Sequence, residues 1–323
     1  MLNTIYWTKH IFCALFSNRA LPYKCPFFGR ELRQILLGLK FYILIKHLIE
    51  ITKPGITLWV GITAFGGSII ANVDIIKSLI ISFFVMVSAG GSAVLNNYFD
   101  RDIDRIMNRT KNRALASNKI NPKIALIYGF LLCIFGLLGI LYFSFKAFIL
   151  DLIAIISYSF VYTFLKRKTP FSIIIGSIPG ALPTSIGYIA MKNEIDIIAF
   201  SLFSLMFLWQ PAHFIYLSLF LKDDYKNAKI PTISVKYSYE YNKILSFVYS
   251  FSIIPITIAI YYIANLSYGF LILVLFLNLI WITLNFIYWK SIINEKLMFI
   301  FSNFYVLFIF SLIVFDKIII HKL

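Results

Sequence analysis

The sequence predicts an all-α, polytopic membrane protein with about nine transmembrane helices, and two observations lead to this prediction. The first is composition: of 323 residues, 60% are hydrophobic and only 14% are charged, which lies outside the range of soluble domains. The second is a series of apolar runs of about twenty residues, each long enough to cross the roughly 30 Å hydrocarbon layer as a helix. A strand barrel is excluded, because its segments would be about ten residues long and would alternate in and out.

The N-terminal part of the chain differs from the rest. Residues 1–30 carry basic side chains and no acidic one, which favours a basic cytosolic tail, with an organellar targeting peptide as the alternative. In residues 31–52, basic side chains recur every seven residues along one side of a helix whose other faces are Leu and Ile: Arg33, Lys40 and His47. This pattern predicts an amphipathic helix that lies in the membrane interface.

Apolar runs define the predicted spans in the remaining chain. Their limits are residues 55–73, 77–97, 122–143, 147–165, 171–191, 196–220, 244–264, 268–288 and 297–316. The loop within residues 122–165 is so short that this pair of spans admits a different division. With residues 1–52 assigned to the tail and the interfacial helix, residues 53–323 are predicted to form a single transmembrane domain.

The distribution of positive charge predicts the orientation. A formal net charge of +16 could indicate a nucleic-acid partner, but the Lys and Arg residues are concentrated in the loops after the second, fourth, sixth and eighth spans. By the positive-inside rule these loops and the N-terminus face the cytosol, or the matrix of a mitochondrion. We therefore expect a lipid bilayer, and no nucleic acid, as the partner of this basic chain. Cys13, Cys25 and Cys133 form no CxxC pair, so neither a disulfide framework nor a zinc site is expected.

The most informative pattern follows the second span, in LNNYFDRDIDRIMNRTKNRAL at residues 95–115. If the helix continues through this segment, Asn96, Asp100 and Asp104 lie four residues apart on one face, and Asn108 continues the line. Carboxylates at this spacing repel one another unless a cation lies between them. Oxygen ligands of this kind suit Mg²⁺, which keeps several waters and completes its shell with substrate phosphates. The pattern predicts a Mg²⁺ site at the cytosolic end of the second span.

Basic side chains are interleaved with these acids and suit the binding of anionic oxygens. They are Arg101, Arg105, Arg109, Lys111 and Arg113. Three other interpretations compete with a metal and diphosphate site. A solvated charged loop explains the mixed charge but not acids at helical spacing beside a bilayer, and an EF-hand fails because Arg105 replaces its turn glycine and Lys111 its terminal Glu. Salt bridges from Asp100 or Asp104 to nearby arginines are compatible with a functional site.

A second charged segment, residues 207–231, follows the sixth span. Apart from a kink at Pro211, the helical period places His213 and Asp224 near one face, with the imidazole inside the membrane. An ionisable group there is a functional candidate, and a His that is hydrogen-bonded to a neighbouring span is the structural alternative. Asp223 and Asp224 lie near lysines and are candidates for a second metal or diphosphate half-site.

A third segment, YTFLKRKTP at residues 162–170, follows the fourth span. Lys166, Arg167 and Lys168 are first of all the basic anchor that the positive-inside rule expects after a span. Because they share a membrane face with both acidic segments, they are also candidates for diphosphate contacts.

Together these segments resemble the UbiA-type intramembrane prenyltransferases and, within them, the protohaem IX farnesyltransferases, or haem O synthases. The first Asp-rich motif of that family resembles NNYFDRDIDRIMNRTKNR, its basic motif resembles YTFLKRKTP, and its later His and Asp motifs resemble WQPAHF and KDDYKNAKIP. Further landmarks resemble ITKPG at residues 51–55 and IIIGSIPGALPTSIGY at residues 173–188, so the similarity runs in order from about residue 50 to about residue 235. Ala114 and Ala212 stand where the family pattern has Pro, which concerns local backbone shape more than polar chemistry.

The resemblance implies a UbiA-like bundle with its active site at the cytosolic or matrix side. It implies that Asn96, Asp100 and Asp104 hold Mg²⁺ on farnesyl diphosphate, with Asp224 on the opposing side. Substrate contacts are implied for Arg101, Lys111, Arg113, Lys166, Arg167 and Asp223. His213 is expected to contact the iron or a propionate of haem B.

The implied reaction transfers a farnesyl group from farnesyl diphosphate to a vinyl group of haem B, and the addition of water then gives haem O. Diphosphate leaves with electrostatic help, and an apolar chamber shields the allylic cation from water. Haem A synthase or oxidase-assembly proteins are the implied protein partners, and a bacterial cytoplasmic membrane is favoured over the mitochondrial inner membrane. The rivals are a UbiA-type enzyme that acts on a quinone-precursor ring and a multi-span transporter, whose ionisable groups would lie near the midplane.

Overall fold

The computed structural model describes residues 29–322, so the basic tail predicted for residues 1–30 lies almost wholly outside the described residues, as do Cys13 and Cys25. All regular secondary structure in the described part is helical, and nine of its helical segments are long and apolar enough to cross a membrane. The predicted all-α fold with about nine spans is therefore confirmed.

Helix α2 (Gly29–Ile51) is the first described element and covers the helix predicted at residues 31–52. Its residues up to Lys46 belong to one compact unit, and the chain from His47 onward forms another. The interfacial position of α2 and the domain boundary after residue 52 stay predictions. All site residues discussed below belong to the second unit.

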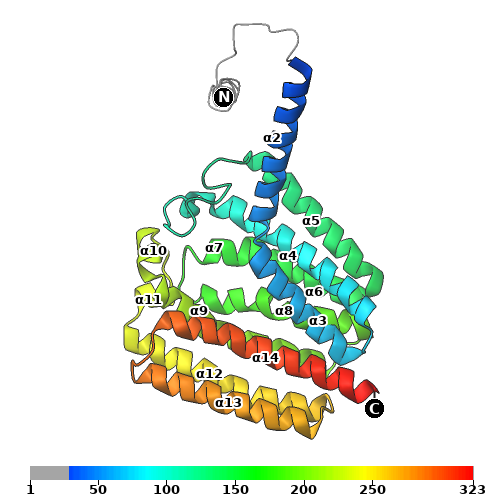
Figure 1. The fold of residues 1–323 in the computed structure, drawn as a ribbon. Helices are drawn as coiled ribbons and strands as arrows, with labels where there is room; N and C mark the ends of the chain where they lie inside the picture. The colour runs from blue at the N-terminus through cyan, green and yellow to red at the C-terminus, as the bar shows by residue number, and fades with distance from the viewer. Residues whose placement is uncertain (1–28, 323) are drawn as a thin grey trace, which may run out of the picture. The chain divides into compact units, whose positions relative to one another are not determined.

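The helices after α2 form the transmembrane bundle and its connections (Figure 1). In chain order they are α3 (Pro54–Ala71), α4 (Ile75–Asp104), α5 (Pro122–Phe143), α6 (Phe145–Ile156), the π-helical segment η1 (Ser157–Tyr162), α7 (Thr163–Leu165), α8 (Ser172–Lys192), α9 (Ile197–Phe220), α10 (Lys222–Asn227), α11 (Ile233–Lys236), α12 (Tyr239–Ile263), α13 (Tyr268–Trp289) and α14 (Glu295–Lys322). Side-chain caps fix several of the starts. At α4, for example, the carboxylate of Asp74 accepts the backbone N–H of Lys77.

Two differences from the predicted spans bear on the site. The second span, predicted to end at residue 97, continues as α4 to Asp104, because most of the polar side chains in its last turns are buried against protein and are not exposed to water. The fourth span, predicted as one helix over residues 147–165, is divided into α6, η1 and α7. Apolar periodicity could not reveal this division, because a π-helical segment widens the turn locally without changing the apolar character of the span.

Glycine allows the close crossing of α3 and α8, which pack against each other in the bundle. A Cβ added at Gly67 would lie 1.9 Å from the carbonyl oxygen of Thr184, and one at Gly187 would lie 2.0 Å from the carbonyl oxygen of Ala64. The two backbones therefore touch where each helix lacks a side chain, as is common between transmembrane helices. This crossing fixes α3, whose first turn borders the site described below.

Gly67→Ala is expected to lower the thermal unfolding midpoint of the detergent-solubilised protein. The added methyl group would force α3 away from α8, and overpacking of this kind costs about 1–3 kcal/mol. Gly55→Ala is the matched control on the same helix, because a Cβ there meets no described atom within 4 Å. Circular dichroism during heating measures both midpoints, and equal values for the two variants would contradict the close crossing.

The connections after α4, α7, α9 and α13 lie at one end of the bundle, on the left in Figure 1. We call this end the basic face and define it by residues 105–121, 166–171, 221–238 and 290–294. It is the end at which the sequence predicts the acidic and basic motifs to meet.

Candidate active site

The last turns of α4 present a row of buried polar side chains at the basic face. Asn96, Asp100 and Asp104 are 3%, 3% and 6% exposed, and Nδ2 of Asn96 donates to Oδ2 of Asp100 at 2.8 Å. The four-residue spacing thus places these three side chains, which we call the carboxylate row, on one helical face. The helix ends at Asp104, so Asn108 lies in the following loop and the prediction that it continues the line is wrong.

Cations from the connection between α7 and α8 reach Asp100. Nζ of Lys166 donates to Oδ2 of Asp100, and Nη2 of Arg167 lies 3.6 Å from its Oδ1. Arg167 also donates to both carboxylate oxygens of Asp102, at 2.8 and 2.9 Å, and this hydrogen bonding raises the pKa of its guanidinium. Lys168 is exposed, so the basic triplet divides into two residues that face the carboxylates and one that faces outward.

Asp104 pairs with the loop that follows its own helix. Nη1 of Arg113 donates to the two carboxylate oxygens of Asp104 at 3.2 and 3.0 Å and lies 3.4 Å from Oδ1 of Asn97. Nδ2 of Asn97 in turn donates to the carbonyl oxygen of Ile51 at 2.7 Å. Salt bridging between α4 and nearby arginines is therefore present, and it holds a guanidinium beside the carboxylate row.

The π-helical segment η1 places aromatic and hydroxyl groups against the same row. The rings of Tyr158 and Tyr162 stack with centroids 5.9 Å apart, and Nζ of Lys166 lies 5.6 Å from the centroid of Tyr162. Just beyond η1, Oγ1 of Thr163 accepts a hydrogen bond from Nδ2 of Asn96 at 2.7 Å. π-Helical segments are rare in proteins, and those that occur are frequently found at functional sites. Sequence reasoning missed these contacts because an apolar span does not display the widened turn.

Lys53 is a further site residue to which the sequence analysis assigned no role. It precedes α3 in the left-handed backbone region, with φ 56°, and its Nζ donates to Oδ1 of Asn96 at 2.7 Å and to the hydroxyl of Tyr158 at 3.4 Å. Burial, reinforced by the charge of Arg113, lowers the pKa of Lys53 to about 8, so the ammonium persists at neutral pH. The sequence feature that could have identified Lys53 as a site residue is its position in ITKPG, directly before the first span.

Asp224 contacts the loop after α4. Its carboxylate oxygens accept the backbone N–H groups of Asn108 at 3.2 Å and Arg109 at 3.1 Å. Asp224 lies on α10, a helix separate from α9, so the prediction that one continuous helical face carries both His213 and Asp224 is wrong. Asp223 is exposed. The two acidic segments thus meet through backbone amides of the intervening loop.

His213 lies in α9 and is anchored to α14. Its Nδ1 is 2.7 Å from Oγ of Ser302, and its ring stacks on Trp209 with centroids 4.4 Å apart and lies 4.6 Å from the ring of Phe299. Trp209 Nε1 also donates to the carbonyl oxygen of Ser302, at 2.9 Å. These are the contacts of a His hydrogen-bonded to a neighbouring span, and none of them involves the carboxylate row.

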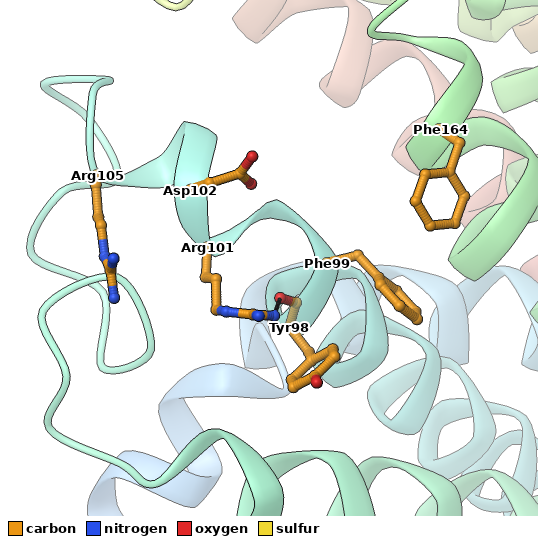
Figure 2. A pocket seen from close by; sticks show the side chains of 6 residues that line it. All are labelled: Tyr98, Phe99, Arg101, Asp102, Arg105 and Phe164. Carbon is orange, nitrogen blue, oxygen red and sulfur yellow. Dashed lines mark hydrogen bonds between the residues drawn. The ribbon is translucent and has the colours of Figure 1, made fainter.

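Arg101 and Lys111 are not brought to the carboxylate row in the described structure. Nη1 of Arg101 donates to the carbonyl oxygen of Tyr98 at 2.6 Å, and its guanidinium lies 4.4 Å from the centroid of that ring (Figure 2). The cause is helical phase, because consecutive residues point about 100° apart. Lys111 is exposed and its Nζ donates to Oδ1 of Asn108 at 3.0 Å.

The donors of the carboxylate row fit Mg²⁺ that binds together with a substrate. Within residues 29–322, no group of three or more His, Cys, Asp or Glu side chains is arranged to hold a metal ion by itself. Oδ1 of Asp100, however, is buried and has no hydrogen-bond partner among the described residues. Mg²⁺ is usually bound by one or two carboxylates, with water and substrate phosphates as the other ligands. Two carboxylates one helical turn apart, one with an unpaired oxygen, meet this requirement.

Comparison with known sequences shows the family of the chain. Residues 56–311 match the UbiA prenyltransferase family. Over 282 residues, the chain is 36% identical to a protoheme IX farnesyltransferase from Aquifex aeolicus (strain VF5), which covers 85% of this chain and 96% of that relative. A protoheme IX farnesyltransferase from Pelagibacter ubique (strain HTCC1062) is 36% identical over 283 residues, 84% of this chain and 93% of the relative.

Solved structures show the same fold. A digeranylgeranylglyceryl phosphate synthase superposes with a TM-score of 0.70 at 20% identity, over 85% of this chain and 98% of that one. A UbiA homolog from Archaeoglobus fulgidus, bound to GPP and Mg²⁺, superposes with a TM-score of 0.61 at 14% identity, over 86% of this chain and 100% of that one. The chain is therefore an integral, multi-pass membrane protein that belongs to the UbiA prenyltransferase family, where it groups with the protohaem IX farnesyltransferases.

Proposed function

We propose that this prenyltransferase transfers the farnesyl group of farnesyl diphosphate to a vinyl group of haem B and so forms haem O. The observation behind the proposal is the carboxylate row of α4, surrounded by the cations of Lys53, Arg113, Lys166 and Arg167 at one end of an apolar bundle. Relatives named protoheme IX farnesyltransferase support this choice of donor and acceptor. Membership of a prenyltransferase family leaves the transporter interpretation without support.

The metal of the reaction is proposed to be Mg²⁺, with Asn96, Asp100 and Asp104 as its ligands and Asp224 on the opposing side. When bound, Mg²⁺ supplies positive charge that links the carboxylates to the diphosphate and stabilises it as a leaving group. The UbiA homolog from Archaeoglobus fulgidus that was solved with GPP and Mg²⁺ supports this assignment. Asp224 also holds the loop after α4 in place through the two hydrogen bonds that its carboxylate accepts from backbone N–H groups of that loop.

The cations of the chain are proposed to bind the diphosphate and to stabilise the charge that develops as it leaves. Arg113, Lys166 and Arg167 already point at the carboxylate row, so they need little reorganisation to meet phosphate oxygens beside it. Fixed donors aimed at developing charge are commonly the largest electrostatic contribution to catalysis. Substrate contacts from Arg101, Lys111 and Asp223 stay predictions.

His213 is proposed to contact the iron or a propionate of haem B. Its Nδ1 is engaged with Oγ of Ser302, which leaves Nε2 as the ring nitrogen for such a contact. The rings of Trp209 and Phe299 hold the imidazole in one orientation. A propionate or an iron atom would thus meet a positioned rather than a mobile ligand.

We propose a bacterial cytoplasmic membrane as the location, with the basic face toward the cytosol. The relatives from several bacteria and the positive-inside rule support this placement. The mitochondrial inner membrane, with the basic face toward the matrix, is the alternative.

The proposal is tested by incubating the purified protein with haem B, farnesyl diphosphate and Mg²⁺ and then measuring the mass of the haem product. We expect a haem whose mass has increased by one farnesyl group and one hydroxyl group, the second proton of the added water being released. Prenylation of a quinone-precursor ring by a folded preparation that leaves haem B unchanged would replace the proposed acceptor with the rival one.

Lys53→Met is expected to raise the KM for farnesyl diphosphate about tenfold. One charge-assisted contact to the diphosphate contributes about 1.5–3 kcal/mol of binding free energy, and neighbouring cations partly compensate for its loss. Lys123→Met is the control, since Lys123 is an exposed cation at the start of α5. Initial rates at varied farnesyl diphosphate give both constants. An unchanged KM for Lys53→Met would remove Lys53 from the diphosphate site.

A further inference from the structure

A hollow lies on the side of α4 that faces away from the carboxylate row (Figure 2). Its volume is about 630 Å³, and its lining consists of Tyr98, Phe99, Arg101, Asp102, Arg105 and Phe164. The helical period places Asp102 and Tyr98 on the opposite side of α4 from Asp100. The hollow is therefore distinct from the proposed prenyl-transfer site, although both lie at the basic face.

Two guanidinium groups give the hollow its charge. Among the described residues, neither Arg101 nor Arg105 pairs with a carboxylate. Arg105 donates to the carbonyl oxygen of Ala116 at 3.0 Å and to Oδ1 of Asn118 at 2.6 Å, and Arg101 donates to the carbonyl oxygen of Tyr98. A guanidinium has five N–H donors, so these bonds orient each side chain and leave further donors for a ligand.

The acid of the lining does not cancel this charge. Both oxygens of Asp102 accept hydrogen bonds from Arg167, at 2.8 and 2.9 Å. In Figure 2 the Asp102 carboxylate points away from the side chains of Arg101 and Arg105. The hollow is thus lined by two guanidinium cations that no carboxylate among the described residues neutralises, and it suits an anion.

Aromatic side chains form the other end of the hollow. Phe164 is 46% exposed, and its ring centroid lies 5.3 Å from that of Phe99. Phe99 also packs against Phe160, with centroids 5.6 Å apart. Both Phe160 and Phe164 belong to the end of the fourth span, residues 145–165, where an exposed apolar surface meets acyl chains. The hollow is therefore cationic toward water and apolar toward the membrane.

We propose that this hollow binds an anionic phospholipid, with its phosphate between Arg101 and Arg105 and an acyl chain along Phe99 and Phe164. Guanidinium groups bind phosphate oxygens through charge-assisted, often bidentate hydrogen bonds. Basic pockets at the ends of transmembrane helices suit anionic headgroups, and a free phosphate has no apolar part to cover the Phe rings. The inference assigns Arg101 to a lipid phosphate instead of the substrate diphosphate, and it does not depend on the proposed acceptor.

The test measures lipid binding to the purified, delipidated full chain by native mass spectrometry, with phosphatidylglycerol and phosphatidylcholine as the two probes. We expect the wild-type protein to prefer phosphatidylglycerol. Because each arginine near an anionic headgroup contributes about a fivefold preference, Arg101→Gln should reduce it about fivefold and the Arg101→Gln, Arg105→Gln double variant roughly thirtyfold. Lys222→Gln with Lys226→Gln removes the same charge from the exposed α10 and should leave the preference intact.

An unchanged preference in the double variant would overturn the proposal, and so would an equal loss in the α10 control. The single variant Arg101→Gln leaves both bonds from Arg105 to the loop in place, so it remains informative if the double variant unfolds. A raised KM for farnesyl diphosphate or haem with unchanged lipid preference would assign the hollow to a substrate and overturn the lipid assignment.

Discussion

Asp100→Asn is expected to reduce farnesyl transfer roughly 10²–10³-fold while the protein remains folded and inserted in the membrane. The substitution keeps the size of a buried side chain but removes the negative charge that faces Lys166 and Arg167. It also removes Oδ1 of Asp100, a buried oxygen with no hydrogen-bond partner within residues 29–322, as an anionic ligand for Mg²⁺. Initial rates with saturating Mg²⁺, together with the thermal unfolding midpoint, measure the two effects separately.

Asp74→Asn is the matched control for that experiment, because it makes the same change at the other end of α4. Asp74 caps this helix by accepting the N–H of Lys77, and Asn caps a helix about as well as Asp. We expect its rate to lie within about twofold of the wild type. If Asp100→Asn also kept nearly full activity, the metal assignment on α4 would be lost.

Lys166→Met is expected to lower the rate of farnesyl transfer about a hundredfold at saturating farnesyl diphosphate, since the loss of one fixed donor to developing negative charge has an effect of this size. In the structure its ammonium already contacts Asp100 and lies over the ring of Tyr162. Single-turnover kinetics is the appropriate measurement, because it separates the chemical step from product release.

Lys168→Met tests whether position, rather than basic charge in general, is responsible. Lys168 is two residues away but exposed, so we expect near wild-type single-turnover rates. An equal loss of rate in both variants would mean that the triplet acts only as a charged anchor of the span.

The spacing of α4 was the part of the site that sequence could predict well. Three polar residues four apart can share a helical face only if the helix continues beyond its apolar part, and α4 does continue to Asp104. The same helical logic failed for Asn108, because the chain leaves the helix one residue after Asp104. It failed again for Asp224, because a break after α9 places that carboxylate on α10.

Other site residues depend on tertiary contacts that a sequence does not display. Lys53 reaches Asn96 across 43 positions of the chain, and Tyr158 reaches it from a π-helical segment that apolar periodicity hides. The outward direction of Arg101 follows from helical phase and could have been predicted, since residues 100 and 101 cannot share a face. The contact between His213 and Ser302 needed the packing of α9 on α14, which the motifs alone do not determine.

The central claim is that the carboxylate row binds farnesyl diphosphate through a metal ion. Isothermal titration calorimetry, with farnesyl diphosphate titrated into the purified protein, tests this claim most directly. With Mg²⁺ present, we expect saturable binding that is lost when EDTA removes the metal and is strongly weakened in Asp100→Asn. Equal affinity with and without Mg²⁺, or unchanged affinity in Asp100→Asn, would contradict a metal site on α4.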